Sequence, residues 1–183
     1  ILIGGRLDKH NMVDNVIFSP RANLRFNPTQ NINLRLSYSS GFRAPQAFDE
    51  DMHIENVGGT VAMIERAKDL KEEKSQSFSV SADMYHRFGA FQTNLLIEGF
   101  YTRLTDVFVL GEPYDRGDGI LVKTRSNGPG AKVMGLTLEG KVAYLSILQI
   151  QAGLTLQRSR YDEPHKWHDD APAEKKIFRT PDT

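Results

Sequence analysis

The feature that most constrains this chain is a period-two alternation of apolar and polar residues that recurs along most of its length. In residues 76–88, for example, Phe78, Val80 and Met84 alternate with serines and with Asp83. Successive side chains of a β-strand leave on opposite faces, so each such stretch predicts a strand with one apolar and one polar face. The pattern therefore predicts an all-β fold.

The alternation predicts strands of unusual length. Several stretches sustain it for more than ten residues, whereas strands of globular proteins most often run about 5–6 residues and barrel strands need about 9–11 to cross a bilayer. The segment 91–110 is the weakest, because apolar residues occur there on both faces. The predicted strands are residues 1–8, 16–26, 31–42, 74–88, 91–110, 120–145 and 148–160.

Composition leaves two kinds of β-protein open. No run of about 18 apolar residues occurs, which excludes a transmembrane helix, but a transmembrane barrel hides its hydrophobicity in alternation. The chain has 23 basic and 23 acidic residues, which gives no argument for a nucleic-acid partner. It has no cysteine, which rules out disulfides. A soluble β-sandwich and a membrane barrel both remain.

The connections favour the barrel. Short links at 27–30, 87–90 and 145–148 alternate with long charged links at 10–15, 43–73, 111–119 and 161–178. In an antiparallel meander every second link lies at the same end, as in bacterial outer-membrane barrels with short turns and long outer loops. This scheme requires residues 120–145 to form one strand, kinked at Gly128–Gly130. Within the longest link, the apolar spacing of residues 61–71 predicts a short helix.

The long links hold the candidate binding residues. Arg43 begins the longest link and is placed to pair with a loop carboxylate or an anionic ligand. The same link carries an acidic cluster that could grip a cation or remain a solvated surface. The last long link carries an aromatic residue between two histidines that could contact a ligand, a partner or the membrane edge. These candidates are Asp49, Glu50, Asp51 and His53 in the first link and His165, Trp167 and His168 in the last.

The run GFRAP at residues 41–45 resembles the barrel signature of TonB-dependent outer-membrane receptors, in which it leads into a long loop. Five further segments resemble family motifs in the family's order: GGRLD, SPR, DLKEEKS, YTRLTD and the run from Asn127 to Gly140. We expect Gly41 to let the strand end bend, Phe42 to lie at the membrane rim and Pro45 to stop the strand. The motif residues to which we assign this structural role are Gly41, Phe42, Arg43, Ala44 and Pro45.

This resemblance implies an antiparallel up-and-down meander that is part of a transmembrane β-barrel of about 22 strands, the size class with a plugged lumen. It implies residues 1–183 as a partial barrel domain, a piece of a longer protein whose plug and remaining strands lie outside this chain. The implied function is TonB-dependent uptake of a nutrient complex, such as an iron–siderophore, across the outer membrane of a Gram-negative bacterium. The implied partners are outer-membrane lipid, the plug of the same protein, TonB and a small nutrient ligand.

Two alternatives stay open from the sequence: a soluble β-sandwich binding module that buries its apolar faces, and a porin-type barrel without a plug. No arrangement of Ser, His and Asp, no phosphate-binding loop and no spaced carboxylate pair stands out. We therefore predict that the protein is not an enzyme and has no cofactor and no bound metal. In the barrel, the polar side chains of the alternation would face the plug; among them are Arg21, Arg25, Arg35, Ser77, Asp83, Thr137, Glu139, Gln151 and Gln157.

Overall fold

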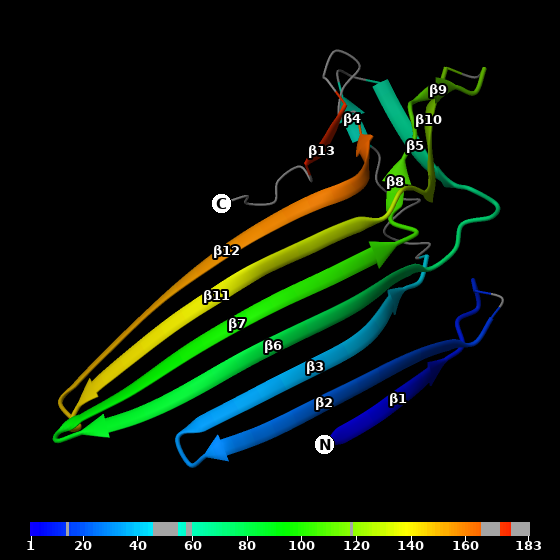
Figure 1. Cartoon of the computed structure of the whole chain (residues 1–183). Coiled ribbons are helices and arrows are strands. Elements are labelled where there is room, and N and C mark those ends of the chain that lie inside the picture. The colour runs from blue at the N-terminus through cyan, green and yellow to red at the C-terminus, as the bar shows by residue number, and fades with distance from the viewer. Residues whose placement is uncertain (14, 46–54, 58–59, 118, 166–172, 177–183) are drawn as a thin grey trace.

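The computed structural model of the chain describes residues 1–13, 15–45, 55–57, 60–117, 119–165 and 173–176. These residues form strands and their connections, arranged as a long curved sheet with a small second sheet at one end (Figure 1). Among them, no helix is long and apolar enough to cross a membrane. The prediction of an all-β fold is confirmed.

The large sheet has eight strands in the order β1-β2-β3-β6-β7-β11-β12-β13, and every neighbouring pair is antiparallel. We call this sheet the wall. Its central strands run 12 to 18 residues, so the predicted long strands are confirmed. The strands of the wall are β1 (Leu2–Asp8), β2 (Ile17–Thr29), β3 (Ile32–Arg43), β6 (Glu73–Phe88), β7 (Phe91–Thr105), β11 (Ala131–Tyr144), β12 (Leu148–His165) and β13 (Glu174–Lys176).

Tight turns and long connections lie at opposite ends of the wall, as predicted (Figure 1). The turns β2–β3, β6–β7 and β11–β12 share one end, which we call the turn end. The connections β1–β2, β3–β6 and β7–β11 share the other, which we call the loop end. The wall is thus the expected up-and-down meander.

The second sheet is built entirely from two of the long connections, and we call it the loop sheet. Its order is β4-β5-β10-β8, with β9 also paired to β10. Strands β4 and β5 come from the connection β3–β6, whereas β8, β9 and β10 come from the connection β7–β11. Its strands are β4 (Glu55–Val57), β5 (Thr60–Arg66), β8 (Phe108–Leu110), β9 (Tyr114–Asp115) and β10 (Leu121–Asn127).

The loop sheet corrects three predictions. Residues 60–66 form strand β5 and not part of a helix over 61–71, because β5 pairs in parallel with β10 of the other connection. The predicted strand 120–145 is two strands in different sheets, β10 and β11, separated at Gly128–Gly130 where proline cannot donate to a ladder. The predicted strand 91–110 is likewise divided into β7 and β8, at Asp106 with a positive φ of 55°.

The wall has one apolar and one polar face. Rows of apolar side chains cross it in register; Leu36 lies opposite Val80, for example, and Leu138 lies between Ile97 and Leu154. These side chains are exposed, with Val80 at 59%. Polar residues are in register on the other face, where Asp83 is only 8% exposed. The apolar face is therefore the open side of the sheet, and no described segment covers it.

Aromatic rings mark both limits of the apolar face. At the turn end Phe91 stacks on Phe88 and contacts Tyr144, with ring centroids 5.5 and 4.9 Å apart. Toward the loop end Tyr38 and Phe78 are 4.8 Å apart, and Tyr101 is the cross-strand partner of Phe78. About ten residues of β7 separate the two rows, which is about 33 Å along the strand and about 25 Å across a sheet tilted by 40–45°. An apolar band of about 25 Å between aromatic girdles is typical of outer-membrane barrels.

The fully buried apolar side chains of the described residues gather at the loop end, outside the apolar band. Val122 is completely buried and Ile64 is 6% exposed, and both belong to the loop sheet. Val13, at 7%, lies in the connection β1–β2, and Ile17, at 6%, is the first residue of β2. The loop end thus has a small core of its own, which holds the long connections in defined positions.

Candidate functional site

The candidate functional site is the loop end of the wall, where the connections β1–β2, β3–β6 and β7–β11 meet (Figure 1). Long connections carry function most often when a rigid scaffold positions them. Here the wall supplies the scaffold, and the loop sheet joins the second and third connections through the parallel pair β5–β10. Polar contacts attach these connections to each other and to the wall.

Asn127, the last residue of β10, bonds both long connections through its side-chain amide. Its Oδ1 accepts the backbone N–H of Lys71 at 2.7 Å, and its Nδ2 donates to the carbonyl oxygen of Lys71 at 3.0 Å. The same Nδ2 donates to the carbonyl oxygen of Asp106 at 2.8 Å. One amide therefore fixes the end of the β3–β6 connection against the start and the end of the β7–β11 connection.

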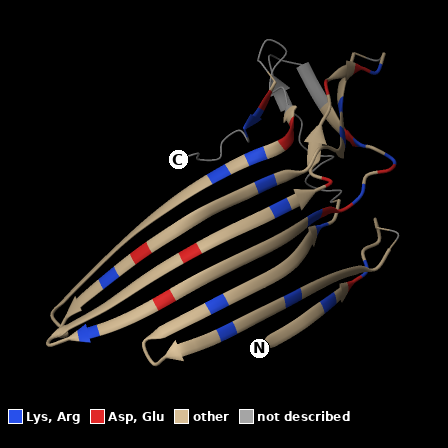
Figure 2. Ribbon diagram, viewed as in Figure 1, with Lys and Arg blue, Asp and Glu red and all other residues tan. Residues whose placement is uncertain are grey.

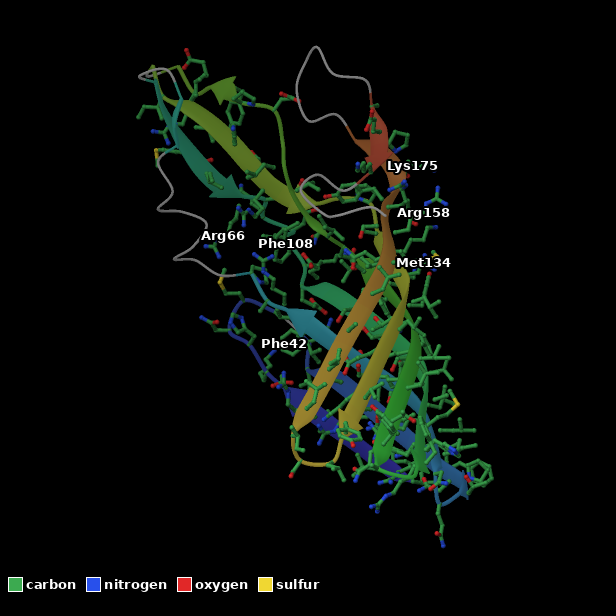
Figure 3. All side chains as sticks on the ribbon, turned by 90° about the vertical axis from the view of Figure 1, so that its left-hand side faces the viewer. Phe42, Arg66, Phe108, Met134, Arg158 and Lys175 are labelled. Carbon is green, nitrogen blue, oxygen red and sulfur yellow. The ribbon has the colours of Figure 1, made fainter. Side chains whose placement is uncertain are left out.

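The residues of the GFRAP run make contacts that explain their positions. Phe42 at the end of β3 receives the guanidinium of Arg6 5.8 Å above its ring, and the guanidinium of Arg43 lies 5.1 Å over the ring of Phe108. Pro45 is almost completely buried. Figure 3 shows Arg66 and Phe108 on the side of the wall opposite to Met134. Arg43 therefore ties the first residues of the long connection to β8.

Glu73, the first residue of β6, forms a hydrogen bond with the backbone of β8. Its Oε2 accepts the backbone N–H of Phe108 at 3.2 Å, and Glu73 is the cross-strand partner of Arg43. Next to it, Glu72 pairs with Lys74 at 3.0 Å. Burial alone would raise the pKa of the Glu72 carboxyl, but its hydrogen bond to its own backbone and the ammonium of Lys74 hold that pKa below its usual value. Glu72 is therefore a carboxylate at neutral pH.

A polar pocket of about 240 Å³ lies between the first and second connections. Met12 lines it from the connection β1–β2, and Pro45, Arg66 and Lys68 line it from the connection β3–β6. Arg66 donates to the thioether sulfur of Met12 at 3.0 Å, which links the two connections directly. At this volume the pocket can hold a small group or part of a larger ligand.

The predicted binding residues are placed only in part. Arg43 is exposed at the end of β3 and makes the contact with Phe108 given above. His165 ends β12, where its backbone is the register partner of Glu174. The structure does not describe the remaining candidates, so their ligand-binding role stays a prediction: Asp49, Glu50, Asp51, His53, Trp167 and His168.

The sequence reasoning missed the residues that organise the loop end, namely Asn127, Glu73, Phe108 and Arg66. Asn127 and Glu73 belong to segments that resemble family motifs, which was a signal that they matter, but a motif match does not tell which group a side chain will meet. Phe108 and Arg66 lie in β8 and β5, which pair with β10, a strand distant in sequence from β5. Local patterns do not reveal such pairing.

The polar face of the wall carries a second polar cluster, near the turn end. The carboxylate of Asp83 accepts the hydroxyl of Tyr85 at 2.7 Å and the side-chain amide of Asn94 at 2.5 Å. The guanidinium of Arg35 lies 3.9 Å from the same carboxylate. Arg35 is the cross-strand partner of Arg25 on β2, so two guanidinium groups lie next to each other on this face. This face is suited to meet another polar surface.

Comparison with known proteins identifies the family of this architecture. A family model described as "TonB dependent receptor-like, beta-barrel" matches residues 1–183. A search of curated protein sequences finds no match.

Solved structures share the fold at low sequence identity. The siderophore receptor PirA from Pseudomonas aeruginosa matches with a TM-score of 0.69 and 19% identity, over 87% of this chain and 31% of that one. The ferric enterobactin receptor PfeA matches with a TM-score of 0.63 and 20% identity, over 85% and 24%. The FrpB iron transporter from Neisseria meningitidis (F3-3 variant) matches with a TM-score of 0.56 and 18% identity, over 80% and 20%. The chain thus spans less than a third of each structure.

Proposed function

Because the chain belongs to the family of TonB-dependent receptor-like β-barrels, we propose that it forms part of the wall of an outer-membrane receptor of a Gram-negative bacterium. The receptor binds a scarce nutrient complex, such as an iron–siderophore, and imports it with energy relayed by TonB. The observation that carries the proposal is the family match over the whole chain. The names of the structural neighbours, an iron transporter and two siderophore receptors, favour an iron complex as the nutrient.

The apolar face of the wall supports the membrane placement. Its height of about 25 Å between aromatic rows fits the hydrocarbon layer spanned by outer-membrane barrels. A soluble β-sandwich predicts that Phe78, Val80, Leu136 and Leu138 are buried, but they are 47%, 59%, 48% and 44% exposed. The sandwich alternative is therefore abandoned. We assign outer-membrane lipid as the partner of this face.

The polar face supports a plug inside the barrel. Arg25 and Arg35 stand opposite each other on this face, with the carboxylate of Asp83 beside Arg35. A plug surface that carries carboxylates and amides would satisfy these groups, as buried polar groups require. A water-filled porin would leave them solvated, and the family match favours the plugged receptor over that alternative. The loop end, with Arg43 and the pocket beside Arg66, then faces the outside and contributes to ligand binding.

Spin labels test the membrane placement. The chain has no cysteine, so single cysteines at Leu34, Phe78 and Leu136 can be labelled without background from this segment. In the whole receptor in bilayers, these labels should be relaxed by oxygen and protected from a water-soluble nickel chelate. Labels at Ser79 and Thr137, on the polar face, are the matched controls and should lack this lipid signature. Nickel access at the first three positions would overturn the membrane placement.

Uptake assays test the transport function. Cells that carry or lack the receptor gene are given radioactive iron as ferric enterobactin, with haem and cobalamin as alternative probes. The proposal predicts uptake of at least one probe that requires both the receptor and TonB. Equal uptake with and without TonB would contradict a TonB-dependent receptor and would restore the porin alternative.

A further inference from the structure

The junction between β10 and β11 contains a chemically labile pair, Asn127–Gly128. Of the nine asparagines in the chain, only Asn127 precedes a glycine. Asparagine is one of the thermolabile residues, because the backbone nitrogen that follows it can attack its side-chain amide carbon. Glycine permits this attack best, since it has no side chain to shield its nitrogen and restricts the backbone least. In the unfolded chain, Asn127 is therefore the asparagine that should lose its amide fastest.

The fold nevertheless requires both residues of the pair. Asn127 accepts a hydrogen bond from the backbone of Lys71 and also donates one to it, which needs a side-chain amide. Gly128 lies against Val109, and a Cβ at position 128 would be only 2.6 Å from Cγ1 of Val109. The side chain of valine is stiff at χ1 and cannot easily turn away. The loop sheet therefore cannot replace either residue of the labile pair without loosening.

The closed loop sheet keeps the two reacting groups apart. The backbone N–H of Gly128 donates to the carbonyl oxygen of Val107 at 2.7 Å. The side-chain Nδ2 of Asn127 donates to the carbonyl oxygens of Lys71 and Asp106. Attack requires the nitrogen of Gly128 to leave Val107 and the side chain of Asn127 to turn back onto its own backbone. These hydrogen bonds must break first, so the reaction proceeds from a locally opened loop sheet.

We propose that Asn127 is a site of spontaneous deamidation and that opening of the loop sheet controls its rate. The backbone nitrogen of Gly128 forms a bond to Cγ of Asn127, the bond from Cγ to Nδ2 breaks, and Nδ2 leaves as ammonia with the proton of the Gly128 N–H. Water then opens the resulting five-membered succinimide ring. Attack of water at Cγ gives aspartate, and attack at the backbone carbonyl carbon gives isoaspartate, in which the main chain runs through the former side chain.

Neither product can restore the closed loop sheet. A carboxylate at position 127 only accepts hydrogen bonds, so the carbonyl oxygens of Lys71 and Asp106 lose their donor. Isoaspartate also adds a main-chain atom between residue 127, which pairs with Phe108, and the N–H of Gly128. Figure 2 shows residues of both charges on the connections at the loop end, so the new charge lies on a surface that is already polar. Deamidation therefore loosens the loop end permanently and leaves the wall folded.

Peptide mass spectrometry of the whole receptor measures the reaction. Trypsin cleaves after Arg125 and after Lys132, and the peptide between these sites contains Asn127 as its only amide side chain. Its acidic forms are separated from the native peptide after incubation at neutral pH, and isoaspartyl methyltransferase identifies isoaspartate. The folded receptor should deamidate at Asn127 about thirtyfold or more slowly than the receptor unfolded in urea, because several hydrogen bonds must open first. Equal rates would overturn the proposal.

The variant Glu73→Ala should accelerate the reaction without changing the reacting pair. Glu73 accepts the backbone N–H of Phe108 at 3.2 Å, and Phe108 is the register partner of Asn127. Loss of this charge-assisted bond should raise the deamidation rate about tenfold or more, since the rate follows the open population. The matched control is Glu139→Ala, which removes a carboxylate that accepts from Gln151 on the wall and should leave the rate unchanged. Equal rates in the two variants, or no acidic form in either, would refute the control by the loop sheet.

Hydrogen exchange of aged receptor tests the consequence. Molecules that carry an acidic residue 127 should exchange the backbone N–H of Lys71 faster than unmodified molecules of the same sample, and migration as a folded barrel should be unchanged. Equal exchange in the two populations would refute the loosening of the loop end. The proposal goes beyond nutrient uptake and does not rest on it. Absence of TonB-dependent uptake would contradict the proposed function and leave this chemistry untouched.

Discussion

Replacement of Asn127 by alanine should loosen the loop sheet while leaving the wall intact. The amide of Asn127 makes three hydrogen bonds, two with the backbone of Lys71 and one with the carbonyl oxygen of Asp106. These bonds join the two connections from which the loop sheet is built. No strand of the wall contains any of the three residues, so the effect should be confined to the loop end.

The size of the effect follows from the exposure of these bonds. A typical hydrogen bond contributes about 0.5–1.5 kcal/mol net, and the two bonds to Lys71 are solvent-exposed, so their freed groups can turn to water. The bond to Asp106 is partly buried and its loss costs more. The sum is about 2 kcal/mol, which corresponds to about thirtyfold faster local opening.

Hydrogen exchange of the whole receptor measures this opening. The backbone N–H of Lys71 and that of Gly128, which donates to Val107 at 2.7 Å, should exchange about thirtyfold faster in Asn127→Ala. Asn127→Asp keeps the oxygen that accepts the N–H of Lys71 but loses the two hydrogen bonds that Nδ2 donates. Its exchange rates should therefore fall between those of the wild type and those of Asn127→Ala. The control Asn33→Ala, at the turn end, should leave both amides unchanged. Unchanged exchange at Lys71 in Asn127→Ala would refute the role of this amide.

Two pairs of variants test the packing and orientation of the wall. Gly135→Ala brings a Cβ within 2.5 Å of a backbone oxygen of β12, so it should lower the free energy of unfolding by about 1–3 kcal/mol. Its control Gly140→Ala, with no atom within 4 Å of the new Cβ, should leave that free energy unchanged. Leu138→Lys places a charge near the middle of the apolar band and should lower the free energy of unfolding by about 2–4 kcal/mol, whereas Thr137→Lys, on the polar face, should lower it much less. Urea titration of the folded band on gels measures all four. Equal losses within either pair would contradict the assigned packing or the assigned faces.

The wall was predictable from the sequence because its information is local. Alternation fixes the face of each side chain, and a one-residue slip would turn a whole strand over, so the apolar rows also fix the register. The turn at Gly89 is a local signal too, since its φ of 58° suits glycine. Some strand boundaries were less accurate. At the turn end, β2 extends to Thr29, beyond the predicted end at residue 26, through a register shift after Phe26.

The loop sheet was not predictable from local sequence patterns, because strands that are distant in the sequence pair to form it. Strand β5 was mistaken for part of a helix since its apolar residues also fit a helical spacing, and only pairing with β10, which is distant in the sequence, makes it a strand. The break at Gly128–Gly130 was recognised as a kink, but no local signal shows that the strand before it belongs to another sheet. The same holds for the candidate site. The hydrogen bonds of Asn127 are made with Lys71 and Asp106, which are distant in the sequence and which only the fold brings close.

The two faces of the wall carry the same departure from sheet-pairing rules. On the polar face Arg25 stands opposite Arg35, and on the apolar side Arg103 stands opposite Lys132. A sequence that specified only a stable sheet would place opposite charges at such pairs. In each pair one cation has a carboxylate of the wall beside it, Asp83 at 3.9 Å from Arg35 and Asp162 at 3.2 Å from Lys132. The wall therefore offsets part of each repulsion with its own carboxylates.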